Sequence, residues 1–470
     1  MSPDHVSPTR LAMRFSVFAL VIGLLLSPIF LFGQATVGTG SIVGTVTDQS
    51  GAVVSGAKVT IANAATGQTV DLTTNSAGAF NSGALIPGSY KVQISSKGFS
   101  TLSTTSTVLV GNTSTVNAKL QLGQESQTVE VQAAEIAVNT EQATVQGVLN
   151  AQQIENLPVN GRNFLDLAQL EPGVQIQEGS TFDPTKNGFS SISFGGRFGR
   201  TARVEVDGVD VSDETVGTTT QNIPASAIQE FQLSQSSLDM STELTSSGSV
   251  NVVTRSGTNQ VHGQLFGNYR NSAVGTAALP GGSKVPWFRE QFGGNFGGAI
   301  IKDKLFYFVD AERNRQDLPN PVLFQGPFVA ASANVGEPFR EIMTTNRLDY
   351  QIGNGAKAFY RFSYDQNSDI RPFGSGPSAQ PFKNRNNTGS HAIGLDFNTG
   401  AFTHAVRFEY LKFRNGIVDG ASEVTGAANP LPNVAINIGG GALFDCQPGS
   451  LFCSGPNFLA PQQTYQSNHQ

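Results

Sequence analysis

The stretch IQEFQLSQSSLDMSTELTSSGSVNVVTRSGTNQVHGQLFGNYRN, from Ile228 to Asn271, decides how the rest of this 470-residue chain is interpreted. Its first part carries an apolar-faced turn and three valines, and a polar break follows at 256–259. Beyond the break, residues 261–270 alternate in character with a period of two, which is typical of a strand between two environments. We interpret this change as the junction between a globular domain and a β-barrel.

Composition favours a mainly β protein that binds no nucleic acid. Charged residues make up 14% of the chain and glycines number 52, proportions unlike those of a helical cytosolic enzyme. The net charge is −6, and no run of Lys or Arg offers the basic surface that nucleic acid requires. The length is enough for about two or three domains.

The sequence contains no pattern that predicts an enzyme, a cofactor or a metal. The five histidines never lie three or four residues apart, and two cysteines cannot complete a four-ligand zinc site. No Gly-Lys-Ser/Thr motif follows a glycine-rich loop, which excludes a nucleotide fingerprint. The two cysteines, Cys446 and Cys453, bracket a Pro-Gly turn, and in an exported protein this favours a small disulfide loop over free thiols.

Residues 1–35 predict a secretory signal peptide. Two arginines precede an apolar run, and small residues at 33–35 provide a cleavage site after Ala35. A membrane-spanning helix is the alternative, but Pro28 interrupts the apolar run. We therefore expect the mature chain to be exported.

Several later segments alternate between apolar and polar residues. Between 356 and 365, aromatic residues and alanines face one way and charged residues the other, with Phe359 as the exception. A soluble sandwich also alternates, but the segments 317–337 and 365–387 are too long and rich in Pro and Gly for its turns. We expect a transmembrane antiparallel β-barrel with a polar lumen, in which these two segments are extracellular loops.

Specific motifs resemble TonB-dependent outer-membrane receptors, in particular the Oar-like group. NVVTRSGTN at 251–259 and HGQLF at 262–266 resemble the junction between the plug domain and the first barrel strand of that family. VNGRNF at 159–164 and VEVDGVDVSD at 204–213 resemble its plug motifs. Asn163 can cap a helix that follows it, and Asp207-Gly208 predicts the turn of a hairpin. The plug residues that carry this likeness are Asn160, Gly161, Arg162, Asn163, Asp207 and Gly208.

Residues 39–122 predict a small β-sandwich. Short strand candidates at 42–47, 58–62, 69–73, 90–94 and 115–120 alternate with turn clusters. IPGSYKV at 86–92 resembles a carboxypeptidase-regulatory-like domain of the prealbumin or carbohydrate-binding-like type. The resemblance implies a periplasmic N-terminal extension that is not itself a peptidase. Whether it binds sugar or acts as a spacer stays open.

The resemblance also implies a short segment that a TonB-type energy-coupling protein of the inner membrane grasps by strand addition. The linker 123–135 lies at that place, and its candidate box is Thr128, Val129, Glu130 and Val131. An α+β plug domain at 136–257 and the first part of the barrel at 258–470 would follow. Because only about seven or eight barrel strands can be identified up to Phe413, we expect a truncated and incomplete barrel. We expect no strand in the polar tail at 462–470.

These features predict an outer-membrane receptor that imports an unidentified ligand, with carbohydrate and peptide as the candidate classes. The expected partners are the TonB-type protein, outer-membrane lipid and that extracellular ligand. The alternative is a surface adhesion or assembly protein that uses the same barrel for display.

Overall fold

The computed structural model describes residues 38–123, 128–131, 146–157, 161–179, 186, 188–213, 215–235, 245, 247–274, 286–322, 329–330, 333–353, 356–372, 378–379, 381–399, 402–420, 434–437, 450–454 and 462–469. The predicted signal peptide, Asn160 and Cys446 lie outside these residues. Among the described residues, no helix is long and apolar enough to cross a membrane.

The N-terminal region forms a sandwich of two small sheets. One sheet has the order β4-β1-β7, with β8 also pairing β1, and the other has the order β3-β2-β5-β6-β9. The strands are β1 (Ser41–Thr47), β2 (Lys58–Asn63), β3 (Thr69–Thr73), β4 (Ala79–Asn81), β5 (Gly88–Ser95), β6 (Thr101–Val108), β7 (Thr113–Thr115), β8 (Ala118–Lys119) and β9 (Thr128–Val131). Alternate residues of β2 and β5 point inward and bury a core that includes Val59, Ile61, Val92 and Ile94.

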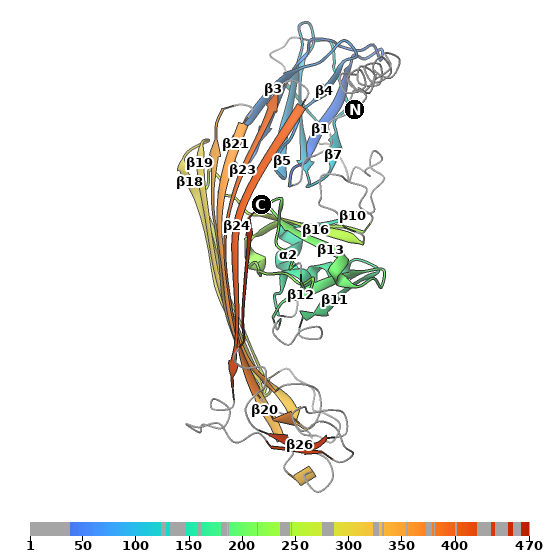
Figure 1. The fold of residues 1–470 in the computed structure, drawn as a ribbon. Coiled ribbons are helices and arrows are strands. Elements are labelled where there is room, and N and C mark those ends of the chain that lie inside the picture. The colour runs from blue at the N-terminus through green and yellow to red at the C-terminus, as the bar shows by residue number, and fades with distance from the viewer. Residues whose placement is uncertain are drawn as a thin grey trace, which may run out of the picture. The chain divides into compact units, whose positions relative to one another are not determined.

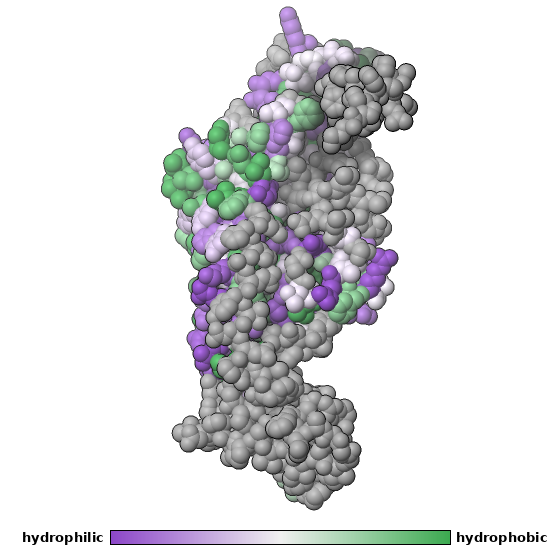
Figure 2. Space-filling view, viewed as in Figure 1, coloured by the Kyte–Doolittle hydropathy of each residue, from purple (hydrophilic) through white to green (hydrophobic). Residues whose placement is uncertain are grey.

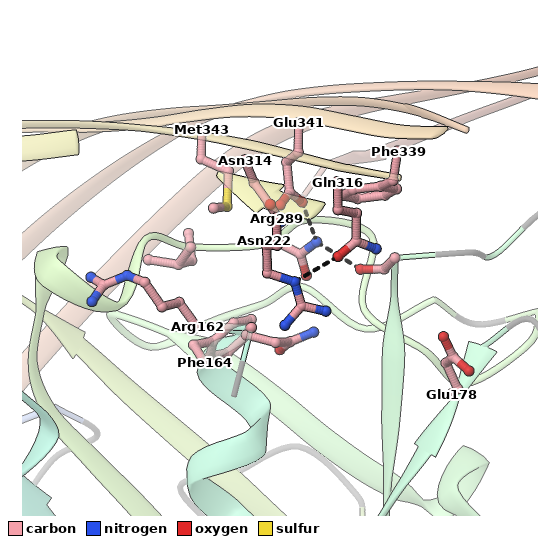
Figure 3. Close-up of a pocket in the computed structure, with 14 residues that line it drawn as sticks. Arg162, Phe164, Glu178, Asn222, Arg289, Asn314, Gln316, Phe339, Glu341 and Met343 are labelled. Atoms are coloured by element: carbon pink, nitrogen blue, oxygen red, sulfur yellow. Dashed lines mark hydrogen bonds between the residues drawn. The ribbon is translucent and has the colours of Figure 1, made fainter. Parts of the chain in front are cut away.

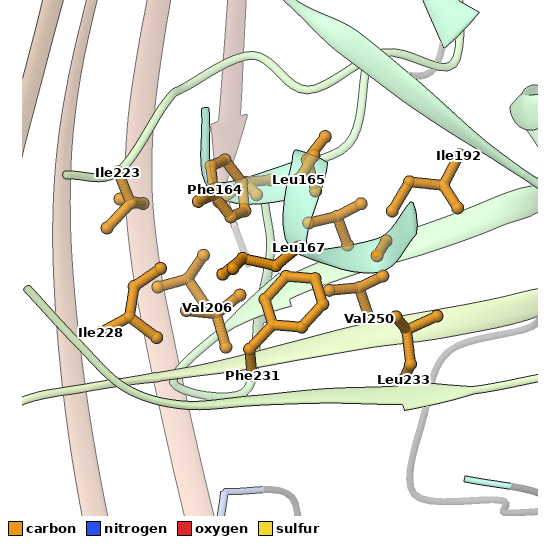
Figure 4. Close-up of a cluster of buried hydrophobic side chains, with 14 of the residues drawn as sticks. Phe164, Leu165, Leu167, Ile192, Val206, Ile223, Ile228, Phe231, Leu233 and Val250 are labelled. Carbon is orange, nitrogen blue, oxygen red and sulfur yellow. The ribbon is translucent and has the colours of Figure 1, made fainter. Parts of the chain in front are cut away.

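The region from 146 to 257, which the sequence predicts as the plug, has a mixed five-stranded sheet of order β10-β15-β16-β13-β14 and a separate β11-β12 hairpin. Its elements are β10 (Gln146–Asn150), α2 (Ala151–Asn156), η1 (Phe164–Leu170), β11 (Val174–Glu178), β12 (Ser190–Phe194), η4 (Gly199–Thr201), β13 (Ala202–Val206), β14 (Val209–Asp210), η5 (Ala225–Ala227), β15 (Ile228–Ser234) and β16 (Gly248–Thr254). Figure 4 shows Phe164 and Leu167 packed onto Phe231 and Val250 of this sheet. Burial of these side chains holds the short helical segment on the sheet.

Local sequence explains the turns of the plug. The side chain of Asn163 accepts a hydrogen bond from the N–H of Leu165 and so caps η1, as its position predicts, although η1 is a 3-10 helix. Asp207 and Gly208 have φ values of 54° and 80°, the geometry of a tight hairpin turn between β13 and β14. The turn fixes where the side chain of Asp207 lies.

The C-terminal half forms one antiparallel sheet of eight strands, which we call the wall, in the order β17-β18-β19-β20-β21-β23-β24-β27 (Figure 1). Its strands are β17 (His262–Asn271), β18 (Phe288–Ile301), β19 (Leu305–Val322), β20 (Ala333–Gln351), β21 (Ala356–Pro372), β23 (Pro381–Thr399), β24 (Phe402–Asp419) and β27 (Gln462–His469). A smaller sheet joins β22 (Ser378–Ala379), β26 (Ser450–Ser454) and β25 (Val434–Asn437). Among the described strands, β17 pairs with β18 alone, so the wall is an open sheet.

Two expectations for the wall were wrong. The segments 317–337 and 365–387 are largely strand, because β19 continues to Val322 and β21 continues to Pro372. The polar segment 462–470, expected to contain no strand, includes β27, which pairs with β24 from Ile417 to Tyr410. Polar residues can extend a strand here because its hydrogen bonds are made to the neighbouring strand, whatever the side chains are.

The two faces of the wall differ as the alternation predicts. One face, which we call outward, exposes apolar side chains such as Leu348, Ile393 and Phe408. The other face, which we call the lumen face, carries buried charged residues such as Arg361, Asp365 and Glu409. The lumen face packs on the plug, since Phe308, Leu411 and Phe413 belong to the same buried cluster as the plug core.

Candidate functional site

Asp207 joins the plug to the wall. Its carboxylate accepts hydrogen bonds at 2.8 Å from Arg347 on β20 and at 2.9 Å from Arg361 on β21. Thr254, at the end of β16, donates to the same carboxylate from its N–H at 2.9 Å and from its hydroxyl at 2.7 Å. The carboxylate therefore connects two plug strands with two wall strands.

Arg361 is the largest side chain that is completely buried among the described residues. Besides Asp207, its guanidinium donates to the carbonyl of Val206 at 2.9 Å and to Glu409 at 3.3 Å. The hydroxyl of Ser390 donates to Glu409 at 2.7 Å. A buried guanidinium loses its water, and only well-placed carboxylates and carbonyls offset that loss. Arg361 is thus held between a plug acid and a wall acid.

Phe359, the apolar exception in the alternation of β21, lies on the lumen face in the same cluster. Its ring centroid is 4.3 Å from the guanidinium carbon of Arg347 and 5.2 Å from that of Arg407. Gly394 on β23 leaves room for the ring, because a Cβ there would lie 2.1 Å from it. The ring therefore lies close enough to both guanidinium groups to attract them through its π face. We call Asp207 and these wall residues the Asp207 cluster.

The charge state of Asp207 follows from this environment. Burial alone would raise the pKa of its carboxyl group. The charges of Arg347 and Arg361, with the hydrogen bonds from Thr254, outweigh burial and hold the pKa of Asp207 below its ordinary value. Asp207 is therefore ionised at neutral pH, as the ion pairs require.

The motif residues Gly161 to Asn163 form a second connection. Arg162 has a φ of 57°, which is unusual for a residue with a side chain, and its Nε lies 3.2 Å from Glu312 on β19. The side chain of Gln291 on β18 donates to the carbonyl of Gly161 at 2.8 Å. The strained turn thus aims a basic side chain at an acid of the lumen face.

A polar cavity of about 160 Å³ lies between this turn and the wall (Figure 3). Asn222, from a plug loop, donates from its Nδ2 to Glu341 and from its N–H to Asp365, both at 2.9 Å. Oδ1 of Asn222 and Oδ1 of Asn314 are buried and have no hydrogen-bond partner among the described residues. Arg289 adds a guanidinium to the lining. The cavity therefore offers donors, acceptors and charge to a polar group.

These contacts can hold a folded domain in place against the wall. In the part of the chain that the structure describes, no group of three or more His, Cys, Asp or Glu residues is placed to hold a metal ion. The connections are charged hydrogen bonds, which are strong in a dry interface and are lost together when the partners separate.

The candidate box Thr128–Val131 forms β9, the outermost strand of its sandwich sheet. It pairs in parallel with β6, from Thr101 opposite Thr128 to Thr104 opposite Val131. In that sheet the order ends at β9, which leaves its outer edge without a described partner strand. The box is therefore remote from the Asp207 cluster in sequence and belongs to another sheet.

Sequence reasoning missed most of the wall side of the site. It identified Asp207 and Arg162 within motifs, and it placed Arg347, Arg361 and Glu409 on the polar side of their strands. Alternation along a strand predicts which face of the sheet a side chain lies on. It does not predict which residue of a domain one or two hundred residues away that side chain contacts. Asn222 carried no signal, because a lone Asn in a loop resembles any turn residue.

Comparison with known proteins identifies two domains. Residues 41–121 match the carboxypeptidase regulatory-like domain, and residues 253–336 match an outer membrane beta barrel domain. The TonB-dependent transporter Oar of Myxococcus xanthus is 24% identical over 307 residues. That alignment covers 61% of this chain and 28% of the relative, so the chain spans less than a third of the relative's length.

Solved structures of outer-membrane receptors are similar to the chain over a little more than half of its length. A mutant of the ferric enterobactin receptor of Pseudomonas aeruginosa is 16% identical, with 58% of this chain and 41% of the receptor covered and a TM-score of 0.45. The outer membrane transporter YddB from Escherichia coli is 11% identical, with 59% of this chain and 40% of the transporter covered and a TM-score of 0.47. The two domain matches and the Oar relative together support the assignment of this chain to the TonB-dependent outer-membrane receptors that carry an N-terminal carboxypeptidase regulatory-like domain.

Proposed function

We propose that this chain supplies the sandwich, the plug and the first wall strands of a receptor that imports a ligand across the outer membrane. The observation that supports this most directly is the Asp207 cluster, which fixes a folded domain to the lumen face of the wall. A lumen occupied in this way passes nothing until the domain moves. Because the outer membrane has no ATP supply or useful potential, the force must come from an inner-membrane partner.

We further propose that this partner, a TonB-type energy-coupling protein, grasps Thr128–Val131. Strand addition needs an extended segment with unpaired backbone groups at one edge. β9 is extended and is the last strand in its sheet, which supports the proposal. Force applied there would reach the plug through the chain that follows.

The ligand, for which carbohydrate and peptide are the candidate classes, is proposed to contact the plug and the lumen face of the wall. The cavity beside Asn222 presents amide, carboxylate and guanidinium groups, which suit a polar ligand. In the described part of the sandwich, Tyr90 and Phe80 are buried in its core and so cannot stack on a sugar, whereas Phe99 is only partly buried against that core. Burial of two of these three aromatic rings favours a spacer role for the sandwich.

The test is uptake by the intact protein in cells, with a radiolabelled oligosaccharide mixture and a radiolabelled peptide mixture as probes. Deletion of Thr128–Val131 is expected to abolish uptake, whereas deletion of the next four residues, 132–135, should leave most of it. A photo-crosslinking amino acid at Val129 should capture the coupling protein. Unchanged uptake after the first deletion would refute the box. Surface binding of the probes without uptake in the wild type would favour the adhesion alternative.

A further inference from the structure

The outward face of the wall changes character along its strands. Cross-strand neighbours near the short turns form apolar rows. One row runs through Tyr307, Leu348, Tyr360, Ile393 and Phe408. The apolar stretch lasts about nine residues on each strand, for example from Ala356 to Tyr364 on β21, and this is the length that a tilted strand needs to cross the hydrocarbon core. Figure 2 shows hydrophobic residues gathered over this part of the sheet.

Basic residues follow the apolar rows on the same face. They are Arg313 and Arg315 on β19, Arg340 on β20, Lys383 and Arg385 on β23, and Lys412 and Arg414 on β24. We call these seven the basic collar. Pairing places Arg315 opposite Arg340, and Asn387 opposite Arg414, so the collar extends across neighbouring strands. It lies between the apolar rows and the strand ends away from the short turns.

The charges of the collar are poorly balanced by acids. On the outward face of the described strands β18 to β24, the acidic residues are Glu290 and Asp317, and Glu290 lies 3.6 Å from Arg315. Arg385, Lys412 and Arg414 are exposed and form no ion pair within the described residues. A wall exposed only to water would usually mix both signs of charge. An unbalanced basic row beside an apolar band instead complements an anionic lipid surface.

The side of the membrane follows from the connections. Short turns, such as 302–304, mark the periplasmic ends of outer-membrane strands, and longer connections mark the extracellular ends. The collar therefore lies at the outer leaflet. We propose that the basic collar binds the phosphate groups of lipid headgroups in that leaflet. Guanidinium and ammonium groups pair with phosphate oxygens, and the adjoining apolar rows contact the acyl chains of the same lipids.

The experiment titrates the intact protein in detergent micelles with fluorescent diphosphorylated lipid A. Lys412→Gln with Arg414→Gln removes two collar charges, and Lys302→Gln with Lys304→Gln removes two basic residues at the opposite membrane boundary. The collar pair should weaken binding by roughly 30-fold, which is about fivefold for each of the two residues. The control pair should change binding by less than about threefold. Circular dichroism verifies that both variants are folded.

The proposal would be overturned by equal affinity of the collar variant and the wild type, by equal losses in the two variants, or by equally tight binding of lipid A without its phosphates. Displacement of lipid A by inorganic phosphate at the same concentration would assign the collar to free phosphate and would also overturn it. The outcome is independent of ligand uptake and so does not depend on the proposed import function.

Discussion

At the scale of single residues, the Asp207 cluster concentrates the charge that holds the plug. Asp207→Asn leaves Arg347 and Arg361 without their shared carboxylate in a buried site. Removal of one partner of a buried pair costs about 3–5 kcal/mol. We expect a loss of that order in the free energy of unfolding of the intact protein in detergent, measured by denaturant titration.

Glu155→Gln provides the matched control for Asp207→Asn. It also removes a carboxylate from an ion pair, with Arg255 at 2.6 Å, but the side chain of Glu155 is 35% exposed. A pair of this kind contributes at most about 1 kcal/mol. Similar effects of the two substitutions would show that the Asp207 cluster has no special role.

Glu230, buried on β15, predicts a dependence of stability on pH. Burial raises the pKa of Glu230 from 4.5 to about 8. Between pH 4.5 and about pH 8, Glu230 loses its proton in the unfolded chain but keeps it in the folded chain. The contribution of Glu230 to the free energy of unfolding is therefore most favourable below pH 4.5 and falls until about pH 8. Glu230→Gln is expected to remove up to about 1.4 kcal/mol per pH unit from that slope. Unfolding free energies at pH 5, 6, 7 and 8 provide the measurement, and an unchanged slope would contradict the assignment.

Part of this site could be predicted from individual residues of the sequence. The Asp-Gly pair at 207–208 predicted a hairpin turn, and the structure confirms it. The interaction of that turn with the wall could not be predicted, because it depends on how two separately folded units pack. Phe359 shows the same limit. In the sequence, Phe359 only breaks the alternation. The structure explains its position, because the ring lies beside Arg347 and Arg407 and fills the space left by Gly394.

At the scale of elements, alternation was informative only where apolar residues occurred. β1, β2, β3 and β5 were predicted within one or two residues. β6, with the sequence TLSTTSTV, was missed, because Ser and Thr hide a period of two although Thr favours strands. In the wall, the end of the aromatic pattern was taken as the end of each strand. The strands continue past the apolar rows, so the loops predicted at 317–337 and 365–387 were longer than those in the structure.

The pairing of β9 with β6 allows a test of whether coupling requires the proposed box to leave the sandwich. In a Thr104→Cys, Val131→Cys double variant, these facing positions are expected to form a disulfide under oxidising conditions. If coupling requires release of β9, oxidation should reduce probe uptake at least tenfold, and a reductant should restore it. Each single cysteine variant serves as the control. Full uptake with the disulfide formed would mean that the partner adds to β9 while it remains in the sheet.

At the scale of the whole molecule, the outward apolar rows determine insertion into the membrane. Phe362→Arg places a charge among these rows on β21. Gln366→Arg places the same charge on the same face, four residues farther along the strand. An arginine near the midplane costs about 2–4 kcal/mol and one near the interface much less. We expect less folded protein in the outer membrane for Phe362→Arg alone, measured by protease resistance of intact cells. Equal yields would contradict the assignment of this face to lipid.

The order of strands in the plug sheet determines how a tensile load would enter it. Among the described strands, β10 is the first plug strand after the proposed box and the edge of its sheet, where it pairs with β15 alone through Gln146 to Asn150. A force applied from the N-terminal side would therefore act first on these few backbone pairs. It would act last on β16, which lies between two neighbouring strands and next to the Asp207 turn. Under such a load, the pairing of β10 with β15 would separate first, and the rest of the plug sheet would follow.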